Sequence, residues 1–286
     1  MTVLLAILSA ACFGIGGVFM RRGILASNTY TGTLVNITVN SLVLLPFSIP
    51  HLISIRFPPA ALLIFGSIGL FVPMVSRFFA VAGIRRIGVS RSQAVVATSP
   101  LFSTLLAIAL LGERPTSLVL LGAVSIVAGL ILLSQSRTGE QQWQKKDLIY
   151  PLGAGLLFAG RDVVAKVGLT QGVPPVLGGA VAATTSAVLL WTITGVFYRH
   201  GTLSCNRKSF WDLAASGLFW GLSYIFMFSA LKTGEVAVVT PLVYASPLFS
   251  ALLSMIFLKD IEIVTARVIL GAVLVVLGGV GIALGR

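Results

Sequence analysis

The chain has 286 residues, of which 57% are hydrophobic and only 10% are charged, and its formal net charge is +12. Soluble domains carry about 25% charged residues, so this composition excludes an ordinary globular protein and predicts an integral membrane protein. Arg and Lys fall in short clusters between apolar runs, so anionic lipid headgroups, and not nucleic acid, are the expected partners of the positive charge.

Apolar runs long enough to cross a bilayer follow one another along the chain. They lie at residues 2–20, 31–50, 60–82, 91–111, 116–134, 148–169, 176–198, 211–231, 235–257 and 263–284, which predicts about ten helices. The first run has no basic segment before it, so we expect a spanning helix there and not a cleaved signal peptide. The most polar connection lies midway and predicts two five-helix halves, residues 1–134 and 148–286, joined by a linker at 135–147.

Three features recur in the same order in both halves: a ten-residue stretch around a proline, an acidic residue after it, and a pair of glycines. In the first half these are ATSPLFSTLL (97–106), Glu113, Gly122 and Gly129, and in the second they are YASPLFSALL (244–253), Asp260, Gly271 and Gly278. Internal repeats of this kind indicate a transporter architecture. Because each half has an odd number of helices, the second half enters the membrane from the opposite side, so the repeats are expected to be inverted.

These repeated features resemble the drug/metabolite transporter superfamily, specifically its EamA type, and the resemblance covers essentially the whole chain. It implies an all-α integral membrane fold of ten helices around a central cavity, which helices one, three, four, six, eight and nine line. It also implies that a small-molecule substrate is reached alternately from each side of the membrane. The sequence has no phosphate-cradling GxxxxGK[ST] motif, so neither an ATP-driven motor nor a cofactor is expected.

The distribution of charge between loops predicts the orientation of the chain. Loops that follow odd-numbered helices carry most of the Arg and Lys residues. The positive-inside rule therefore predicts that both termini lie outside the cytoplasm, whereas family members more often resemble a layout with both ends inside. We expect a multi-pass monomer in a prokaryotic plasma (inner) membrane.

Helix six carries two charged residues, Arg161 and Asp162, near the middle of its apolar run. An ionised side chain at this depth costs several kcal/mol unless it is paired or hydrated. The matched positions of the first repeat are Gly16 and Gly17, so the fold itself does not require these charges. We expect Arg161 either to face a wet cavity and bind an anionic group of the substrate, or to form a buried structural salt bridge with another helix.

Lys166 lies four residues after Asp162 on the same helix, a spacing that favours an ion pair. Arg161 points about 100° away from Asp162 around the helix, so we expect Arg161 to need a different partner. Asp162 is also a candidate carrier of a coupling proton if it is buried.

Further candidates for substrate binding lie in other helices. Arg77 is near the end of helix three, so substrate contact and snorkelling to the interface are both open. Trp220 and Tyr224 share a face of helix eight, and Tyr244 in helix nine is similar. These rings either stack on a ring or cation of the substrate, or pack against protein and lipid. Gln93, near the start of helix four, is a weaker polar candidate.

Pro100 and Pro247, the prolines of the repeated stretch, lie inside predicted spanning helices. Each proline removes an amide donor and opens the backbone hydrogen-bond ladder. One interpretation is a kink that lets helices four and nine bend during alternating access, and the other is a static bend that shapes packing.

Taken with the resemblance, these residues predict a secondary transporter that exports amino acids or related small metabolites by alternating access. A carrier of phosphorylated sugar or nucleotide-type anions, or of cationic or aromatic drugs, is an alternative, and a membrane channel is the alternative outside this class. His51 and His200 lie in separate loops, and His51 follows Pro50, which is expected to end a helix. The sequence shows no metal-ligand cluster and no nucleophile–base constellation, so neither an enzyme nor a metal site is predicted.

Overall fold

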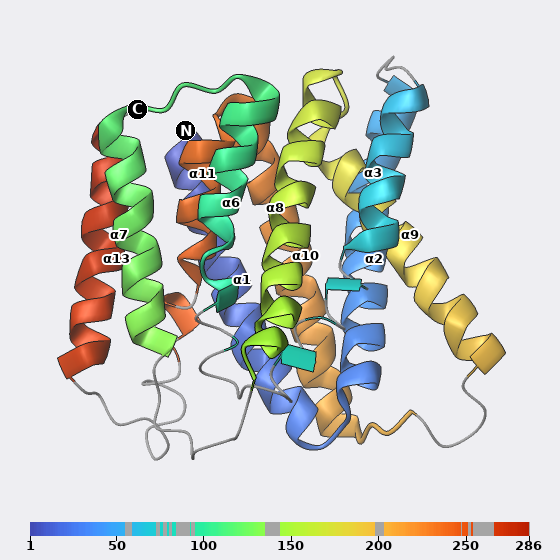
Figure 1. The fold of residues 1–286 in the computed structure, drawn as a ribbon. Helices are drawn as coiled ribbons and strands as arrows, with labels where there is room; N and C mark the ends of the chain where they lie inside the picture. The colour runs from blue at the N-terminus through green and yellow to red at the C-terminus, as the bar shows by residue number, and fades with distance from the viewer. Residues whose placement is uncertain are drawn as a thin grey trace.

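The structure is a computed structural model that describes residues 1–54, 59–72, 75–76, 79, 82–83, 92, 95–134, 144–197, 203–246, 248–250, 253 and 266–285. Within these ranges the chain forms ten α-helices, which confirms the predicted all-α fold (Figure 1). They are α1 (Thr2–Leu25), α2 (Thr29–Ser54), α3 (Pro59–Phe71), α6 (Ser99–Leu106), α7 (Ser117–Ser134), α8 (Ile149–Thr170), α9 (Pro175–Phe197), α10 (Arg207–Thr233), α11 (Val236–Tyr244) and α13 (Ala266–Leu284). A π-helical turn, η1 (Ala107–Leu111), continues α6, and a 3₁₀ turn, η2 (Lys145–Leu148), precedes α8.

The helices have the length and surface of membrane spans. Five of them are long and apolar enough to cross a bilayer, and the others described are shorter apolar helices. Large apolar side chains are exposed on the outside, for example Leu63 at 74% and Leu121 at 67%. Exposing such a surface to water is unfavourable, whereas lipid acyl chains solvate it. Each helix also satisfies its own backbone hydrogen bonds, as a lipid environment requires. The chain is therefore built as a multi-pass membrane protein.

The closing helices of the two halves, α7 and α13, lie side by side at one edge of the bundle (Figure 1). A Cβ placed on Gly122 would lie 2.6 Å from the carbonyl oxygen of Gly278, and one placed on Gly129 would lie 2.5 Å from that of Gly271. Gly122 matches Gly271 in the repeat and Gly129 matches Gly278, so the two contacts exchange when the repeats are exchanged. The sequence repeat is therefore also an inverted repeat in space, and both termini lie at the same end of the bundle (Figure 1).

α1 packs closely along α10, because glycines and serines line the contact. Ser9 and Ser223 approach to 2.9 Å between their hydroxyl oxygens, and Ser209 Oγ donates to the carbonyl oxygen of Gly23 at 2.5 Å. A Cβ at Gly16 would collide with the ring of Trp220. Small residues at these positions let two long helices meet without a gap.

The repeated proline-containing stretch interrupts the fourth helix of each half at the same place. The amide of Thr98 donates to the carbonyl three residues earlier at 3.1 Å, and the amide of Leu101 does so at 2.9 Å. In the second half, Ala245 and Leu248 make the matching bonds at 3.2 and 3.0 Å. Pro100 is then the second residue of α6, directly after the turn. The break is built twice, although Pro247 itself lies outside the described residues.

α2 differs from the prediction at its end. It runs from Thr29 to Ser54 and contains both Pro46 and Pro50, so the expectation that Pro50 ends a helix is wrong. Each proline removes only one amide, and membrane helices accommodate this loss through neighbouring groups and small adjustments of the backbone.

Candidate functional site

The centre of the candidate site is an ion pair buried on α8. The Arg161 residue is 8% exposed and Asp162 is fully buried. Nε and Nη2 of Arg161 donate to Asp162 Oδ1 at 2.9 and 2.7 Å. The expectation that Arg161 needs a partner other than Asp162 is therefore wrong. Although the two residues start in different directions around the helix, the long arginine side chain folds back, and a buried cation is stabilised by the carboxylate within its reach.

The other donors of the Arg161 guanidinium reach toward two tyrosines. Nη1 lies 3.4 Å from the hydroxyl of Tyr224 on α10, and Nη2 lies 3.4 Å from that of Tyr244 on α11. Its central carbon also lies 5.6 Å from the ring centroids of both Phe158 and Tyr224. These contacts are long and weak compared with the bonds to Asp162, so the guanidinium retains the capacity to bind a further acceptor strongly.

Two residues of the site, Ser103 and Met227, are not among the candidates predicted from the sequence. Ser103 Oγ on α6 lies 3.3 Å from Asp162 Oδ2 and 3.2 Å from the carbonyl oxygen of Ser99, so its one hydroxyl proton is shared between these two acceptors. Met227 on α10 places its sulfur 3.6 Å from Arg161 Nη2. Ser103 belongs to the repeated stretch, and that membership was the only signal available for it in the sequence. Four helices thus contribute to one polar cluster, which we call the Arg161 cluster: Arg161, Asp162, Ser103, Tyr224, Met227 and Tyr244.

Lys166 does not join the Arg161 cluster. Its ammonium donates to the carbonyl oxygens of Leu231 at 2.7 Å and Gly234 at 2.6 Å, at the C-terminal end of α10. The predicted Asp162–Lys166 pair is therefore wrong. Lys166 caps α10 instead, because a cation at a helix C-terminus satisfies otherwise unpaired carbonyls and interacts favourably with the helix dipole.

The remaining candidates lie elsewhere or outside the described part. Trp220 is buried between α1 and α10, where its ring stacks on Phe13 with centroids 4.8 Å apart and its Nε1 donates to the Phe13 carbonyl at 3.1 Å. Arg77 and Gln93 lie outside the described residues. Of the predicted substrate-binding residues, the structure brings together Arg161, Asp162, Tyr224 and Tyr244.

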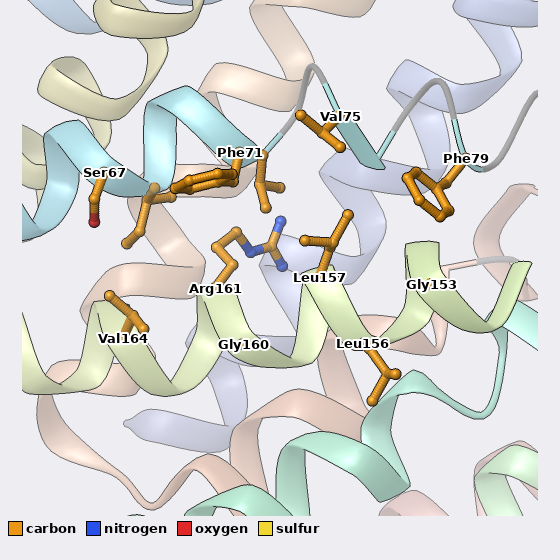
Figure 2. Close-up of a pocket in the computed structure, with 12 residues that line it drawn as sticks. Ser67, Phe71, Val75, Phe79, Gly153, Leu156, Leu157, Gly160, Arg161 and Val164 are labelled. Carbon is orange, nitrogen blue, oxygen red and sulfur yellow. The ribbon is translucent and has the colours of Figure 1, made fainter. Parts of the chain in front are cut away.

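A cavity of about 560 Å³ lies between α3 and α8, and Arg161 forms part of its wall. Figure 2 shows the Arg161 side chain leaving α8 toward the side of the cavity that Phe71 lines. α3 ends at Phe71, two residues before a proline that has no amide for the carbonyl of Gly69. Ser186 Oγ on α9 donates to that carbonyl instead, at 2.5 Å. Phe71 and Val72, at the end of α3, both line the cavity.

Comparison with known proteins decides the class. The family model described as the EamA-like transporter family matches residues 1–135 and 146–284. The chain belongs to the EamA-like transporter family. This EamA-like protein also resembles a solved structure described only as "Crystal structure of protein", with 17% identity, a TM-score of 0.82 and coverage of 99% of this chain and 98% of that one, which shows a shared fold. No curated protein matches in sequence.

Membership of this family confirms three predictions made from the sequence. The chain is a multi-pass membrane transporter, its partner is a small-molecule substrate, and the family is one of transporters and not of enzymes.

Proposed function

We propose that this EamA-like transporter exports amino acids or related carboxylate-bearing metabolites by alternating access, without ATP. The observation that carries the proposal is the buried Arg161–Asp162 pair, joined by two bonds of 2.9 and 2.7 Å, with the remaining arginine donors only loosely held. A carboxylate of the substrate binds Arg161 in the geometry that guanidinium groups favour.

The charges of Arg161 and Asp162 cancel, so the pair favours a substrate that is itself close to neutral. Removing one partner from a buried ion pair leaves an uncompensated charge, which is strongly unfavourable. An amino acid avoids this cost, because its carboxylate faces Arg161 while its ammonium faces Asp162. Tyr224 and Tyr244, which lie 3.4 Å from the guanidinium, supply hydroxyls to the same substrate group.

Asp162 is also the proposed carrier of a coupling proton. A substrate with a carboxylate and no ammonium displaces Asp162 from Arg161 and leaves its carboxylate buried beside Ser103. Protonation of Asp162 then restores neutrality, so transport of such an anion is coupled to a proton. Uptake that is independent of pH in both the wild type and Asp162→Asn contradicts this step.

Location and orientation follow from the charge pattern. Basic residues concentrate in the loops after odd-numbered helices, so we place both termini outside the cytoplasm of a prokaryotic plasma membrane, with the basic loops against anionic headgroups. We propose that the transporter acts as a monomer. Labelling of cysteines introduced near each terminus in intact cells tests this orientation.

The test of the proposed function uses purified protein in detergent. Its melting temperature is measured against amino acids, organic acids, sugar phosphates, nucleosides and cationic drugs, since a ligand of the folded state raises it with the logarithm of concentration. We expect carboxylates to stabilise the wild type and not Arg161→Gln. The control is Arg22→Gln, because Arg22 is a partly exposed arginine that forms an ion pair of 3.5 Å with Asp212 and does not belong to the Arg161 cluster.

Other results assign the chain differently. If sugar phosphates alone act through Arg161, the cargo is a phosphorylated anion. If cationic drugs stabilise Arg161→Gln as well as the wild type, the arginine is structural and the amino-acid proposal is wrong. In liposomes, flux that never saturates and shows no counterflow indicates a channel.

A further inference from the structure

The cavity between α3 and α8 has walls whose chemistry restricts what can occupy it. Its lining residues are Ser67, Ile68, Phe71, Val72, Val75, Phe79, Gly153, Leu156, Leu157, Gly160, Arg161 and Val164. Ser67 and Arg161 are the polar members among these described residues. The hydroxyl of Ser67 is already used, because it donates to the carbonyl of Ile64 in its own helix at 2.7 Å. Among the described lining residues other than Arg161, the wall therefore offers mainly contacts to carbon, and its one side-chain hydroxyl has no proton left to donate to a substrate.

This apolar space lies next to Arg161, the residue that is proposed to bind the substrate carboxylate. The cavity volume of about 560 Å³ falls within the usual range for small-molecule pockets. Figure 2 shows Arg161 on the wall that α8 provides, with Phe71 and Leu157 on either side of its side chain. A substrate whose carboxylate binds Arg161 can therefore place its side chain among these apolar residues.

We infer that the cavity between α3 and α8 is the subsite for a large apolar side chain, so the transporter selects amino-acid-type substrates with branched aliphatic or aromatic side chains. This inference rests on the proposed function. Burial of a leucine- or phenylalanine-sized group is expected to increase affinity at least about tenfold relative to alanine.

Gly160 provides a direct way to fill this subsite. It lines the cavity, and a Cβ built on it would meet no other atom within 4 Å. Leucine is a better helix former than glycine, so Gly160→Leu is expected to fold. Gly195 on α9 is the matched control, since its Cβ would also meet nothing within 4 Å and it does not line the cavity.

The experiment measures thermal stabilisation by glycine, alanine, leucine and phenylalanine over a concentration series for the wild type, Gly160→Ala, Gly160→Leu and Gly195→Leu. We expect the wild type and Gly195→Leu to bind leucine and phenylalanine at least about tenfold more tightly than alanine. Gly160→Leu should lose this preference while still binding alanine, and Gly160→Ala should lie between.

The rival occupant is a lipid acyl chain, because Phe71 and Leu156 beside the cavity are 57% and 49% exposed on the surface that lipid covers. In that case the wild type shows no preference among the four amino acids, or Gly160→Leu keeps the wild-type preference, and either result overturns the inference. Arg161→Gln separates the two proposals. If the wild type binds all four amino acids without preference and Arg161→Gln binds none of them, only the subsite is wrong. If no carboxylate binds to the wild type, the proposed function is refuted.

Discussion

Replacement of Asp162 by asparagine is the most direct test of how the buried pair is balanced. The substitution keeps the shape of the side chain and removes the charge that receives two bonds from Arg161. The side chain of Arg161 is only 7% exposed, so water compensates poorly for the lost carboxylate. Breaking a buried ion pair on one side costs about 3–5 kcal/mol, because the remaining charge is uncompensated. For a chain of this size we expect the melting temperature to fall by roughly 10 °C.

Removing both charges of the pair is expected to cost much less stability than removing one. Replacement of the pair by apolar residues, as in Arg161→Met with Asp162→Leu, removes the desolvation penalty together with the attraction. The measurement is a set of thermal melts of the wild type, the single variant and the double variant in one detergent at one scan rate, since unfolding can be irreversible. The reasoning is refuted if Asp162→Asn melts with the wild type, or if the double variant loses as much stability as the single one.

Two further substitutions test the contacts that join the repeats. Glu113 accepts from the amides of Val236 and Ala237 at 2.7 and 3.0 Å and so caps α11. Glu113→Gln removes the charge from this cap and should cost about 1 kcal/mol of stability, measured by thermal melts. An unchanged melting temperature argues against the cap. A Cβ on Gly278 would lie 2.5 Å from the Gly122 carbonyl oxygen, so Gly278→Leu should force α7 and α13 apart. We expect a loss of about 1–3 kcal/mol or more and a lower yield of folded protein in size-exclusion chromatography. A normal profile and melting temperature would show that the two helices do not meet there.

The number and type of the helices in the described ranges could be predicted from the sequence, because a bilayer forces each span into a long apolar run that closes its own hydrogen bonds. The ends of the helices could not be predicted as well. α10 begins at Arg207, before its apolar run, because the side chain of Asn206 accepts from the amide of Ser209 at 2.7 Å. A polar first turn and its cap are invisible to a search for apolar residues. The repeat boundaries at 134 and 148 stay a prediction.

The charged members of the site stood out in the sequence for the same reason, since an ionised residue within an apolar helix needs an explanation. Their pairing did not follow from it. The spacing along the helix predicted a pair between Asp162 and Lys166. In the structure, Lys166 instead lies beside the carbonyls at the end of α10, and Arg161 folds back onto Asp162. Side-chain length and the position of other helices decide such pairings, and neither is contained in a periodic pattern.

The two repeats differ where the site lies, and the packing of the first repeat gives a physical reason. Gly16 is the match of Arg161, and the ring of Trp220 occupies the space that a side chain at Gly16 would need. A second arginine at this position is therefore incompatible with the close contact of α1 and α10. Residues that join the repeats, such as Gly122 and Gly278, must instead occur in matched pairs, because each contact has a counterpart when the repeats are exchanged. A charged pair present in one repeat alone has no such counterpart, so it favours a ligand with two unlike ends held in one orientation.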